Sequence, residues 1–454
     1  MQDLKLTFHE SSLIFPLQPT QKRSFYLSNI DRMLNYSIPT VYFFAASPDF
    51  PPPLAAEKLK LAAQRVLVPY DYMAGRLNLN TDSGRLEIDC NSAGAGFVVA
   101  SSDFSLHQLG DLVRPNLGFR RLAVQTLDNV DNDNQPLFIL QITSFKCGGF
   151  SIGLCVNHIL LDGMSAKGFN ENLASQAFDD KPLAVVPCFD RRLLAARSPP
   201  RVSFEHREFF KPDLGPGLPV FDCEREELEY RVFQLSPSNV NFLKEMAAKS
   251  SETTANARIS SLSAAAALMW KCKALSRDGE YDKERVSNLL NVLDLRSRLQ
   301  PPLPAEYCGN ALLVSYASAR CEDIDKLEFS ELVKMVAEGP ARVTDEYAKS
   351  AIDWLEINGG LPFGEYMVSS WLRLGFEAVV FPWGKAAHTG PVVSHRKDIC
   401  WVFPTVDGVN ALVSLPPPEM ERFEAHFRKF FSPETNRAAE TAVHIPAAAV
   451  VAIS

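Results

Sequence analysis

The stretch "SFKCGGFSIGLCVNHILLDGMSA", residues 144–166, gives the first indication of the fold. Its apolar part, "GGFSIGLCVN", is typical of a buried strand, and "DGMSAKGFNENLASQAF" predicts a helix with Asp162 as its N-terminal cap. His158 lies between the two. We therefore expect His158 at the end of a rigid strand, where its side chain can point into a cleft, and we expect Ile159, Leu160 and Leu161 to pack inward.

His158 and Asp162 stand four residues apart, and this spacing has two interpretations. A buried imidazole beside a carboxylate can be kept neutral and oriented, which a general base at pH 7 requires. A core histidine followed by a capping aspartate would show the same pattern. His107 and Asp111 share the spacing in a polar stretch where both are expected to face solvent, so the spacing alone decides nothing.

Composition limits the kind of protein. A chain of 454 residues with 46% hydrophobic and 22% charged residues exceeds one usual core, so we expect two or more domains. A net charge of −8 disfavours nucleic acid as a partner. The nine cysteines form no CxxC pair, which predicts reduced core thiols and no metal site. The polar start and the lack of any apolar run near 20 residues predict a cytoplasmic protein without a membrane span.

The pattern of strands and helices predicts an α/β fold with two similar halves. In the first half we expect strands at 40–46, 96–102, 121–127 and 137–145, a helix at 55–70 and a polar turn at 128–136. In the second half we expect helices at 236–251, 261–277 and within 326–356, and strands at 285–295, 377–381, 399–404 and 410–415.

The two halves are expected to be separate domains. Residues 192–219 have the Pro and Gly content of a long crossover, which divides the chain into domains 1–191 and 220–454. Their interface is the natural place for a deep pocket. The weakly patterned tail after Pro433 is expected to be disordered at its end.

Several blocks of the sequence resemble one known family. "SFKCGGFSIGLCVNHILLDGMSA" resembles the core block of the plant BAHD acyltransferases, in which Phe-Lys-Cys-Gly-Gly leads by a strand into HxxxDG. The resemblance runs from about residue 5 to residue 432. The other blocks, in the order of the family, are "FYLSNIDRML", "VPYDYMAGRL", "NVLDLRSRLQPPLPAEYCGNAL", "VTDEYAKSAIDWLE", "SSWLRLGFEAVVFPWGKA" and "VDGVNALVSLPPPEMERFEAHF".

The resemblance implies two pseudo-symmetric, chloramphenicol-acetyltransferase-like domains around a channel that admits acyl-coenzyme A and a small-molecule acceptor. It implies that His158 takes the proton from an acceptor hydroxyl or, less commonly, an amine, as that atom attacks the thioester. No acyl-enzyme is needed, because both substrates are held together, and the imidazolium can protonate the departing thiolate. We expect acyl-coenzyme A as co-substrate, no bound cofactor, a monomer, and a role in plant specialised metabolism.

The resemblance also assigns residues around the base. Asp162, with Gly163, matches a mainly structural position that is commonly tied to an arginine. Arg296 and Arg298 match one structural residue and one that faces the coenzyme, and the sequence does not sort them. Asn310 matches a channel position, where it would bind backbone or substrate.

In the block "SSW", Trp371 matches a position on the acceptor side of the channel. Trp371 would line the pocket there, although a core tryptophan between strands would look the same. Ser369 and Ser370 would be donors to the developing oxyanion.

The second signature of the family, DFGWG, is degenerate here. The chain reads "VFPWG": Val380 replaces Asp and Pro382 replaces the first Gly, while Trp383 and Gly384 remain. In the family that Asp pairs with an arginine, and a buried ion pair that loses one partner costs about 3–5 kcal/mol. We therefore expect Arg296 or Arg298 to have another acceptor, Asp294 or Glu377.

The degenerate signature leaves two alternatives to the transferase. They are a non-catalytic accessory protein of very-long-chain lipid or wax elongation and a lyase derived from the same family. The intact His158 favours the transferase, because an accessory protein has no chemical need for it.

Overall fold

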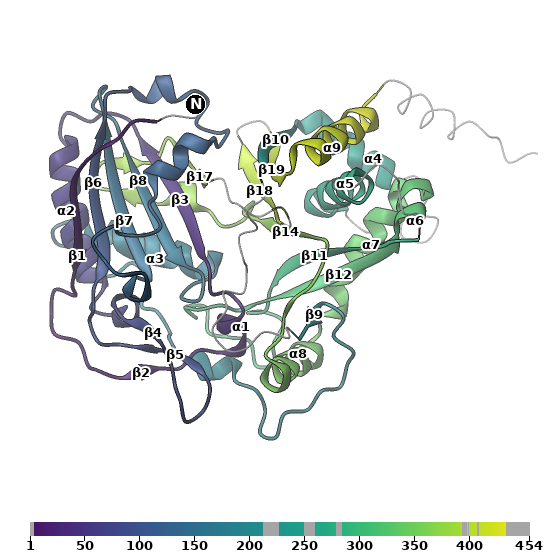
Figure 1. Ribbon diagram of the computed structural model, residues 1–454, viewed down its shortest axis with the longest axis horizontal. Helices are drawn as coiled ribbons and strands as arrows, with labels where there is room; N and C mark the ends of the chain where they lie inside the picture. The colour runs from purple at the N-terminus through teal and green to yellow at the C-terminus, as the bar shows by residue number, and fades with distance from the viewer. Residues whose placement is uncertain are drawn as a thin grey trace, which may run out of the picture.

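The apolar runs of the first half form a sheet with the order β1-β6-β7-β8-β3-β17 (Figure 1). The computed structural model describes residues 4–211, 227–248, 259–277, 284–392, 397, 399–405 and 408–432. Only β6 and β7 pair in parallel; every other pair in this described sheet is antiparallel. The strands are β1 (Thr7–Ile14), β3 (Ser37–Phe44), β6 (Ala95–Ser102), β7 (Phe138–Phe145), β8 (Phe150–Asn157) and β17 (His388–Pro391).

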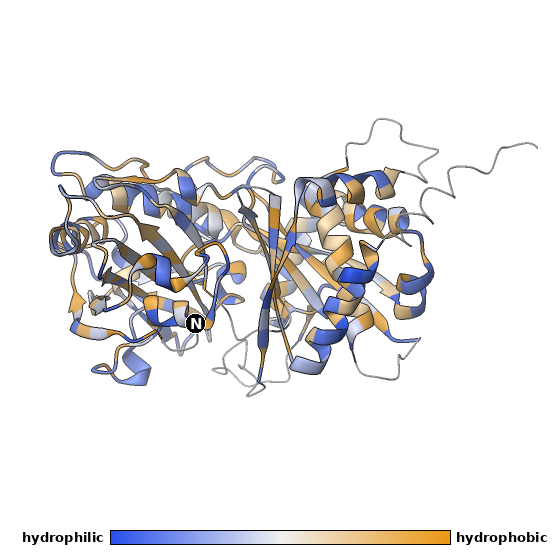
Figure 2. Ribbon diagram, turned by 90° about the horizontal axis from the view of Figure 1, so that it is seen from above, coloured by the Kyte–Doolittle hydropathy of each residue, from blue (hydrophilic) through white to orange (hydrophobic). Residues whose placement is uncertain are grey.

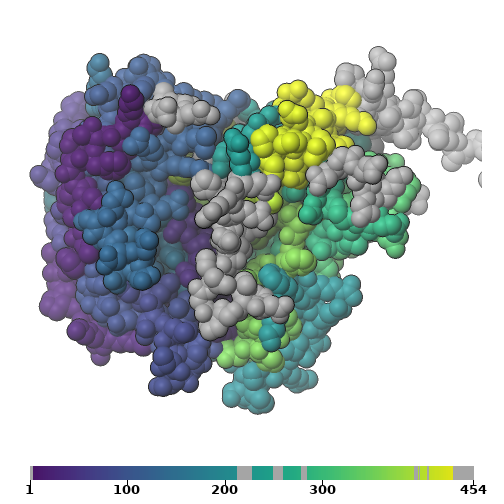
Figure 3. Space-filling model, in the orientation of Figure 1, coloured from purple at the N-terminus to yellow at the C-terminus, as the bar shows by residue number. Residues whose placement is uncertain are grey.

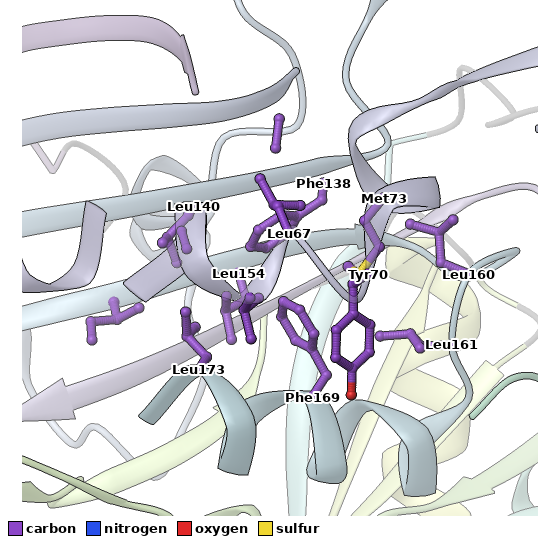
Figure 4. Close-up of a cluster of buried hydrophobic side chains, with 14 of the residues drawn as sticks. Leu67, Tyr70, Met73, Phe138, Leu140, Leu154, Leu160, Leu161, Phe169 and Leu173 are labelled. Carbon is purple, nitrogen blue, oxygen red and sulfur yellow. The ribbon is translucent and has the colours of Figure 1, made fainter. Parts of the chain in front are cut away.

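Strands β7 and β8 are the centre of this sheet because their sequences are almost continuously apolar, which suits strands covered on both faces. Helices α2 (Pro52–Val66) and α3 (Gly163–Gln176) pack against each other over one face. In Figure 4, Phe169 and Leu173 of α3 point toward Phe138, Leu140 and Leu154 of the strands. This packing holds the strand that ends beside His158.

The second half repeats the plan with a sheet of order β10-β19-β18-β14-β11-β12. Most of its helices lie on the side away from the first half, as the view from above shows (Figure 2), whereas α8 (Asp345–Asn358) packs against α1 (Asn29–Arg32) of the first half. Helix α5 (Ser261–Ser276) is buried almost throughout, because it is surrounded by α4 (Pro237–Ala248), α7 (Phe329–Arg342) and α9 (Pro417–Phe430). The strands are β10 (Glu229–Leu235), β11 (Val286–Asp294), β12 (Leu312–Arg320), β14 (Tyr366–Ser370), β18 (Ile399–Thr405) and β19 (Gly408–Leu415).

The remaining described elements are short or lie at the edges of these layers. The helices are α1 (Asn29–Arg32), α4 (Pro237–Ala248), α6 (Cys321–Lys326), α7 (Phe329–Arg342), α8 (Asp345–Asn358) and α9 (Pro417–Phe430). The small strands are β2 (Ser24–Phe25), β4 (Arg76–Leu79), β5 (Leu86–Asp89), β9 (Phe209–Phe210), β13 (Leu361–Pro362), β15 (Val380–Phe381) and β16 (Gly384–Lys385). The 3₁₀ helices are η1 (Asp71–Ala74), η2 (Leu106–Leu109), η3 (Leu117–Leu122), η4 (Asn132–Asn134), η5 (Arg191–Leu194) and η6 (Phe376–Ala378).

The two halves lie side by side (Figure 3), and they exchange one segment. Strand β17 belongs to the C-terminal part of the sequence but pairs with β3 at the edge of the first sheet. The β15–β16 hairpin next to it packs Phe381 and Trp383 into the first core. The predicted α/β fold with two sheet-containing halves is confirmed. The domain boundary at 192–219 stays a prediction, and β17, which comes from the C-terminal part but pairs in the first sheet, does not follow it.

Two predicted strands are wrong. Residues 121–127 do not pair; the segment crosses the sheet face, because Gln141 binds Val124 N and Arg121 O through its side-chain amide. Gly153 in β8 permits that close crossing, since a Cβ there would collide with Leu122 O. Residues 377–381 form part of η6 and the two-residue β15 instead of one strand. The tail after Pro433 and residues 212–219 of the crossover lie outside the described residues.

Cysteines and helices bear on two further predictions. The eight cysteines of the described residues are all free, and most are buried; Cys223 lies outside that part of the chain. Among the described residues, no helix is both long and apolar enough to cross a membrane.

Candidate active site

A cavity of about 1750 Å³ lies between the two halves. The first half contributes one face of β3 and β8 and the start of α3, and the second contributes β11, β12, β14, β18 and the helices α4, α5 and α7. On β8 the alternate residues Leu154 and Val156 line the cavity, as the two-residue period of a strand requires, and His158 continues the series just past the strand end.

His158 is held by its backbone at the end of β8. Its N–H donates to Tyr36 O at 2.7 Å, and the side chain of Asn157 accepts from Ile159 N to close the turn. The next three residues are buried as predicted: Ile159 and Leu160 are fully buried, and Leu161 is 4% exposed. The imidazole is therefore carried on a rigid turn and faces the cavity.

Asn310 determines which ring nitrogen of His158 carries the proton in the neutral imidazole. His158 Nδ1 lies 3.0 Å from Asn310 Oδ1, while Asn310 Nδ2 donates to His158 O at 2.8 Å and to Asp31 Oδ1 at 2.8 Å. Because both neighbours of Nδ2 are acceptors, the amide cannot be turned round without loss, so Oδ1 must receive the proton of Nδ1. The lone pair is then on Nε2, which has no hydrogen-bond partner in the part of the chain that the structure describes.

Burial lowers the pKa of His158 below its usual 6.5, although Asp162 and the bond to Asn310 act in the opposite direction. A histidine with a lowered pKa is neutral at pH 7. The site therefore combines a neutral ring, a defined tautomer and an unoccupied Nε2, the three properties that a general base needs.

Asp162 does not contact His158; it holds the turn beside it. Its Oδ1 accepts from Ser165 N at 2.8 Å and so caps α3, and its Oδ2 accepts from Ala311 N at 3.0 Å. Arg296 donates to both oxygens at 2.9 Å. Burial opposes the charge of Asp162, but Arg296 and these N–H groups hold its pKa below the usual value.

The two arginines of "DLRSR" have different partners. Arg296 binds Asp162 and also Asp294 Oδ1 at 2.9 Å, so the predicted alternative acceptor is Asp294, and Glu377 is exposed instead. Arg298 donates to Pro340 O and Val343 O at the end of α7, where helical carbonyls lack partners. Both side chains line the cavity.

Trp371, Ser369, Ser370 and Gly163 of the predicted site also line the cavity. Trp371 is 9% exposed, packs its ring edge-on against Phe376 and Trp401, and lines the cavity, so it is both core and wall. Ser369 and Ser370 line the cavity too. Gly163 lies where a Cβ would come within 2.8 Å of Leu374 Cδ1 from the other half. Asn310 is fully buried and does not line the cavity, so of the two predicted uses only the contact with backbone and buried groups is present.

The degenerate signature lies away from this cavity. Val380 is 49% exposed, so the replaced Asp leaves no buried partner uncompensated there. Pro382 and Trp383 form the turn of the β15–β16 hairpin, and Gly384 has φ +104°, a conformation that favours glycine. The Trp383 ring stacks on Phe381 with centroids 5.2 Å apart.

Sequence reasoning missed two residues of the site. Asp31 and Arg191 are fully or almost fully buried and reach His158 through Asn310. The sequence around Asp31 does show a pattern, because Ser28-x-x-Asp31 is a capping box. A capping role fully accounts for this aspartate, so the pattern gives no reason to expect that it also contacts Asn310. Nothing in the sequence around Arg191 distinguishes it from its neighbour Arg192.

Comparison with known proteins identifies the family of the chain. A family model described as "Transferase family" matches residues 4–430. The chain belongs to this family, the BAHD acyltransferases, and is an acyltransferase built on two sheet-containing domains.

Individual relatives cover almost the whole chain. Acyltransferase GLAUCE from Arabidopsis thaliana is 47% identical over 94% of this chain and 96% of its own length. Omega-hydroxypalmitate O-feruloyl transferase, also from A. thaliana, is 31% identical over 92% of both chains. The crystal structure of an F. graminearum protein complexed with coenzyme A and T-2 mycotoxin has TM-score 0.72 at 16% identity, covering 91% of this chain and 98% of that one.

Proposed function

We propose that this acyltransferase moves an acyl group from a coenzyme A thioester to a hydroxyl group, with His158 as the general base. The observation that carries the proposal is the hydrogen bond between His158 Nδ1 and Asn310 Oδ1, because it places the proton of the neutral ring on Nδ1 and leaves Nε2 open to the cavity. The acceptor oxygen attacks the thioester carbonyl as Nε2 takes its proton. The C–S bond then breaks, and the imidazolium returns that proton to the departing sulfur.

The size of the cavity supports a reaction without an acyl-enzyme. A pocket for one drug-sized ligand has roughly 300–1,000 Å³, and about 1750 Å³ gives room for two substrates together. Binding both reactants in one cavity turns a bimolecular step into an effectively unimolecular one.

We assign the coenzyme to the side of the cavity formed by α4, α5 and α7. Lys244 and Lys334 line this side together with Glu331 and Glu338, and Glu331 lies 4.0 Å from Lys334 Nζ. Ser260 and Ser263 lie on the same side at the start of α5. The positive end of a sixteen-residue helix together with two lysines suits the phosphates of coenzyme A. The F. graminearum neighbour, which shares the fold, was crystallised with coenzyme A.

We assign the acceptor to the opposite side, formed by β3, β8, α3, β14 and β18. None of the lining residues on these described elements is charged, and Tyr42 OH accepts from Asn170 Nδ2 at 2.6 Å. An acceptor with an uncharged, apolar body fits such a wall better than a carboxylate or an ammonium group, because a buried unpaired charge is costly. The name of one relative includes omega-hydroxypalmitate, whose hydroxyl lies at the end of a long apolar chain, with the carboxylate at the far end of that chain.

The accessory-protein alternative gains no support. A protein used only for interaction has no need of a defined histidine tautomer, and the curated relatives above carry the names of acyltransferases.

The test is product formation by the purified full chain, followed by mass spectrometry with a panel of acyl-coenzyme A thioesters. Acceptors are offered as matched pairs of alcohol and amine with the same apolar body. His158→Ala is expected to lower kcat about 10²–10⁴-fold, the usual contribution of a general base.

The matched control is His107→Ala, because His107 has the same spacing to an aspartate but is exposed on η2. This variant is expected to keep full activity. Transfer by His158→Ala within threefold of the unmodified chain would refute the base, and preference for the amine of each pair would refute the hydroxyl acceptor.

A further inference from the structure

A buried chain of three side chains stands behind the proposed base. Asn310 contacts His158 on one side and Asp31 on the other, and Asp31 forms an ion pair with Arg191 at 3.2 Å. All three are at most 2% exposed. They come from α1, from η5 and from the segment before β12, so the folded chain alone brings them together.

The Asp31 carboxylate is surrounded by donors. Its Oδ1 accepts from Asn310 N at 3.2 Å and from Asn310 Nδ2 at 2.8 Å. Its Oδ2 accepts from Ser28 N at 2.9 Å and from Ser28 Oγ at 2.8 Å. A carboxylate can only accept, so Asp31 accepts only the donor end of the Asn310 side chain.

Arg191 makes that buried carboxylate tolerable. Its guanidinium donates to Cys308 O and to Leu160 O, and it lies over the rings of Phe25 and Tyr72. Burial opposes its charge, but Asp31 raises the pKa of Arg191 above its usual value. The cation is therefore permanent, and it offsets the negative charge that Asp31 would otherwise present toward His158.

The direction of each hydrogen bond now follows from the one before it. Asp31 Oδ1 accepts at 2.8 Å, and the carbonyl oxygens of His158 and Ile159 accept at 2.8 and 3.3 Å, so Asn310 presents Nδ2 to all three acceptors. Asn310 then presents Oδ1 to His158, which leaves the proton on Nδ1 and the lone pair on Nε2. If the Asn310 amide turned round, Asn310 Nδ2 would donate to His158 Nδ1, and the ring would carry its proton on Nε2. His158 would then present an N–H donor to the cavity and could not accept a proton there.

We propose that Asp31, neutralised by Arg191, is a positioning residue that fixes the tautomer of His158 through Asn310. This inference rests on the proposed function, since a tautomer matters only if Nε2 receives a proton. Asp31 touches neither substrate nor the imidazole.

The first measurement is the tautomer itself in the unmodified chain, by nitrogen NMR of the full-length protein with labelled histidine. His158 is assigned by comparison with His158→Gln. We expect Nδ1 protonated and Nε2 unprotonated at pH 7.5. A ring protonated on Nε2 would overturn the inference even if no variant folded.

The second measurement uses Asp31→Asn. The new side-chain NH₂ group replaces one of the two accepting oxygens of Asp31, so it meets the donors of either Asn310 or Ser28. We expect His158 to populate the Nε2-protonated form and kcat to fall about 10²–10⁴-fold, with KM for the acyl-coenzyme A within about threefold. The range follows from histidine-directed aspartates elsewhere, where the wrong tautomer costs about 10⁴ in kcat. An unchanged tautomer, or kcat within threefold, would overturn the inference.

The matched control is Asp353→Asn. Asp353 is also fully buried and paired with an arginine, Arg197, but it lies on α8 and also caps Arg201 N. This variant is expected to lose stability without changing the tautomer of His158 or kcat. An equal loss of kcat in both variants would reduce Asp31 to a merely structural residue, whereas transfer by His158→Gln would refute the base and leave the tautomer result standing.

Discussion

Arg296 holds Asp162 with two parallel hydrogen bonds of 2.9 Å, one to each carboxylate oxygen, across the two halves of the molecule. Such a paired geometry is the strong form of the arginine–carboxylate contact. Asp162 starts the helix after the histidine turn, and Arg296 follows β11 in the other half. The contact therefore fixes the turn of the proposed base relative to the opposite wall of the cavity.

Removing this arginine should destabilise the protein. Arg296→Ala leaves the buried Asp162 without its counter-ion, so the free energy of unfolding should fall by about 3–5 kcal/mol. Urea unfolding measures it. Arg320→Ala, which breaks an exposed pair with Glu284, should change the free energy by less than about 1 kcal/mol. Equal effects of the two substitutions would contradict the role of Arg296.

The pH dependence of the reaction follows from the lowered pKa of His158. The protonated ring cannot act as a base, so kcat/KM should be low at acid pH, rise with a midpoint below 6.5, and be level at pH 7. A pH–rate profile with saturating acyl-coenzyme A measures the midpoint. A midpoint above 6.5 would mean that neighbouring acceptors, rather than burial, dominate the environment of the ring.

Gly309 should tolerate no side chain. A Cβ at this position would overlap the guanidinium of Arg191, so Gly309→Ala should lower the free energy of unfolding by about 1–3 kcal/mol. Gly168 on α3 is the control, because a Cβ there meets nothing within 4 Å. Gly168→Ala should raise the free energy by about 0.5–1 kcal/mol through helix propensity. Urea unfolding of both variants decides, and a neutral Gly309→Ala would show that Arg191 can move.

Trp383, which remains from the second signature, should contribute to the stability of the fold. Its ring packs against Phe44, Phe150 and Phe381 in the first core, so Trp383→Ala should cost about 3–5 kcal/mol. Val380→Asp, which restores the residue of the family at an exposed position, should change the free energy by no more than about 0.5 kcal/mol. A large gain in stability from Val380→Asp would contradict this expectation, because it would mean that the new carboxylate forms an ion pair with an arginine.

Most elements with a strong period or a long apolar run could be predicted from the sequence. The strand and helix around His158, the helix at 55–70 and the strand at 285–295 agree with β8, α3, α2 and β11 within a few residues. The segment 121–127 could not, because its strand-like composition is overridden by Gln141, whose amide satisfies the backbone groups that a ladder would otherwise bind. Nothing local to 121–127 contains that information.

The family, the place of His158 at a strand end and the role of Asp162 as a helix cap could all be inferred before the fold was known, since these depend on residues that are neighbours in the chain. The tertiary structure decided what holds the imidazole. Asp31, Arg191 and Asn310 lie more than a hundred positions from one another in the sequence. They contact one another only because the fold buries them together. Out of reach of water, a polar group must be satisfied by whatever the fold brings to it, and that choice is made in space and not along the chain.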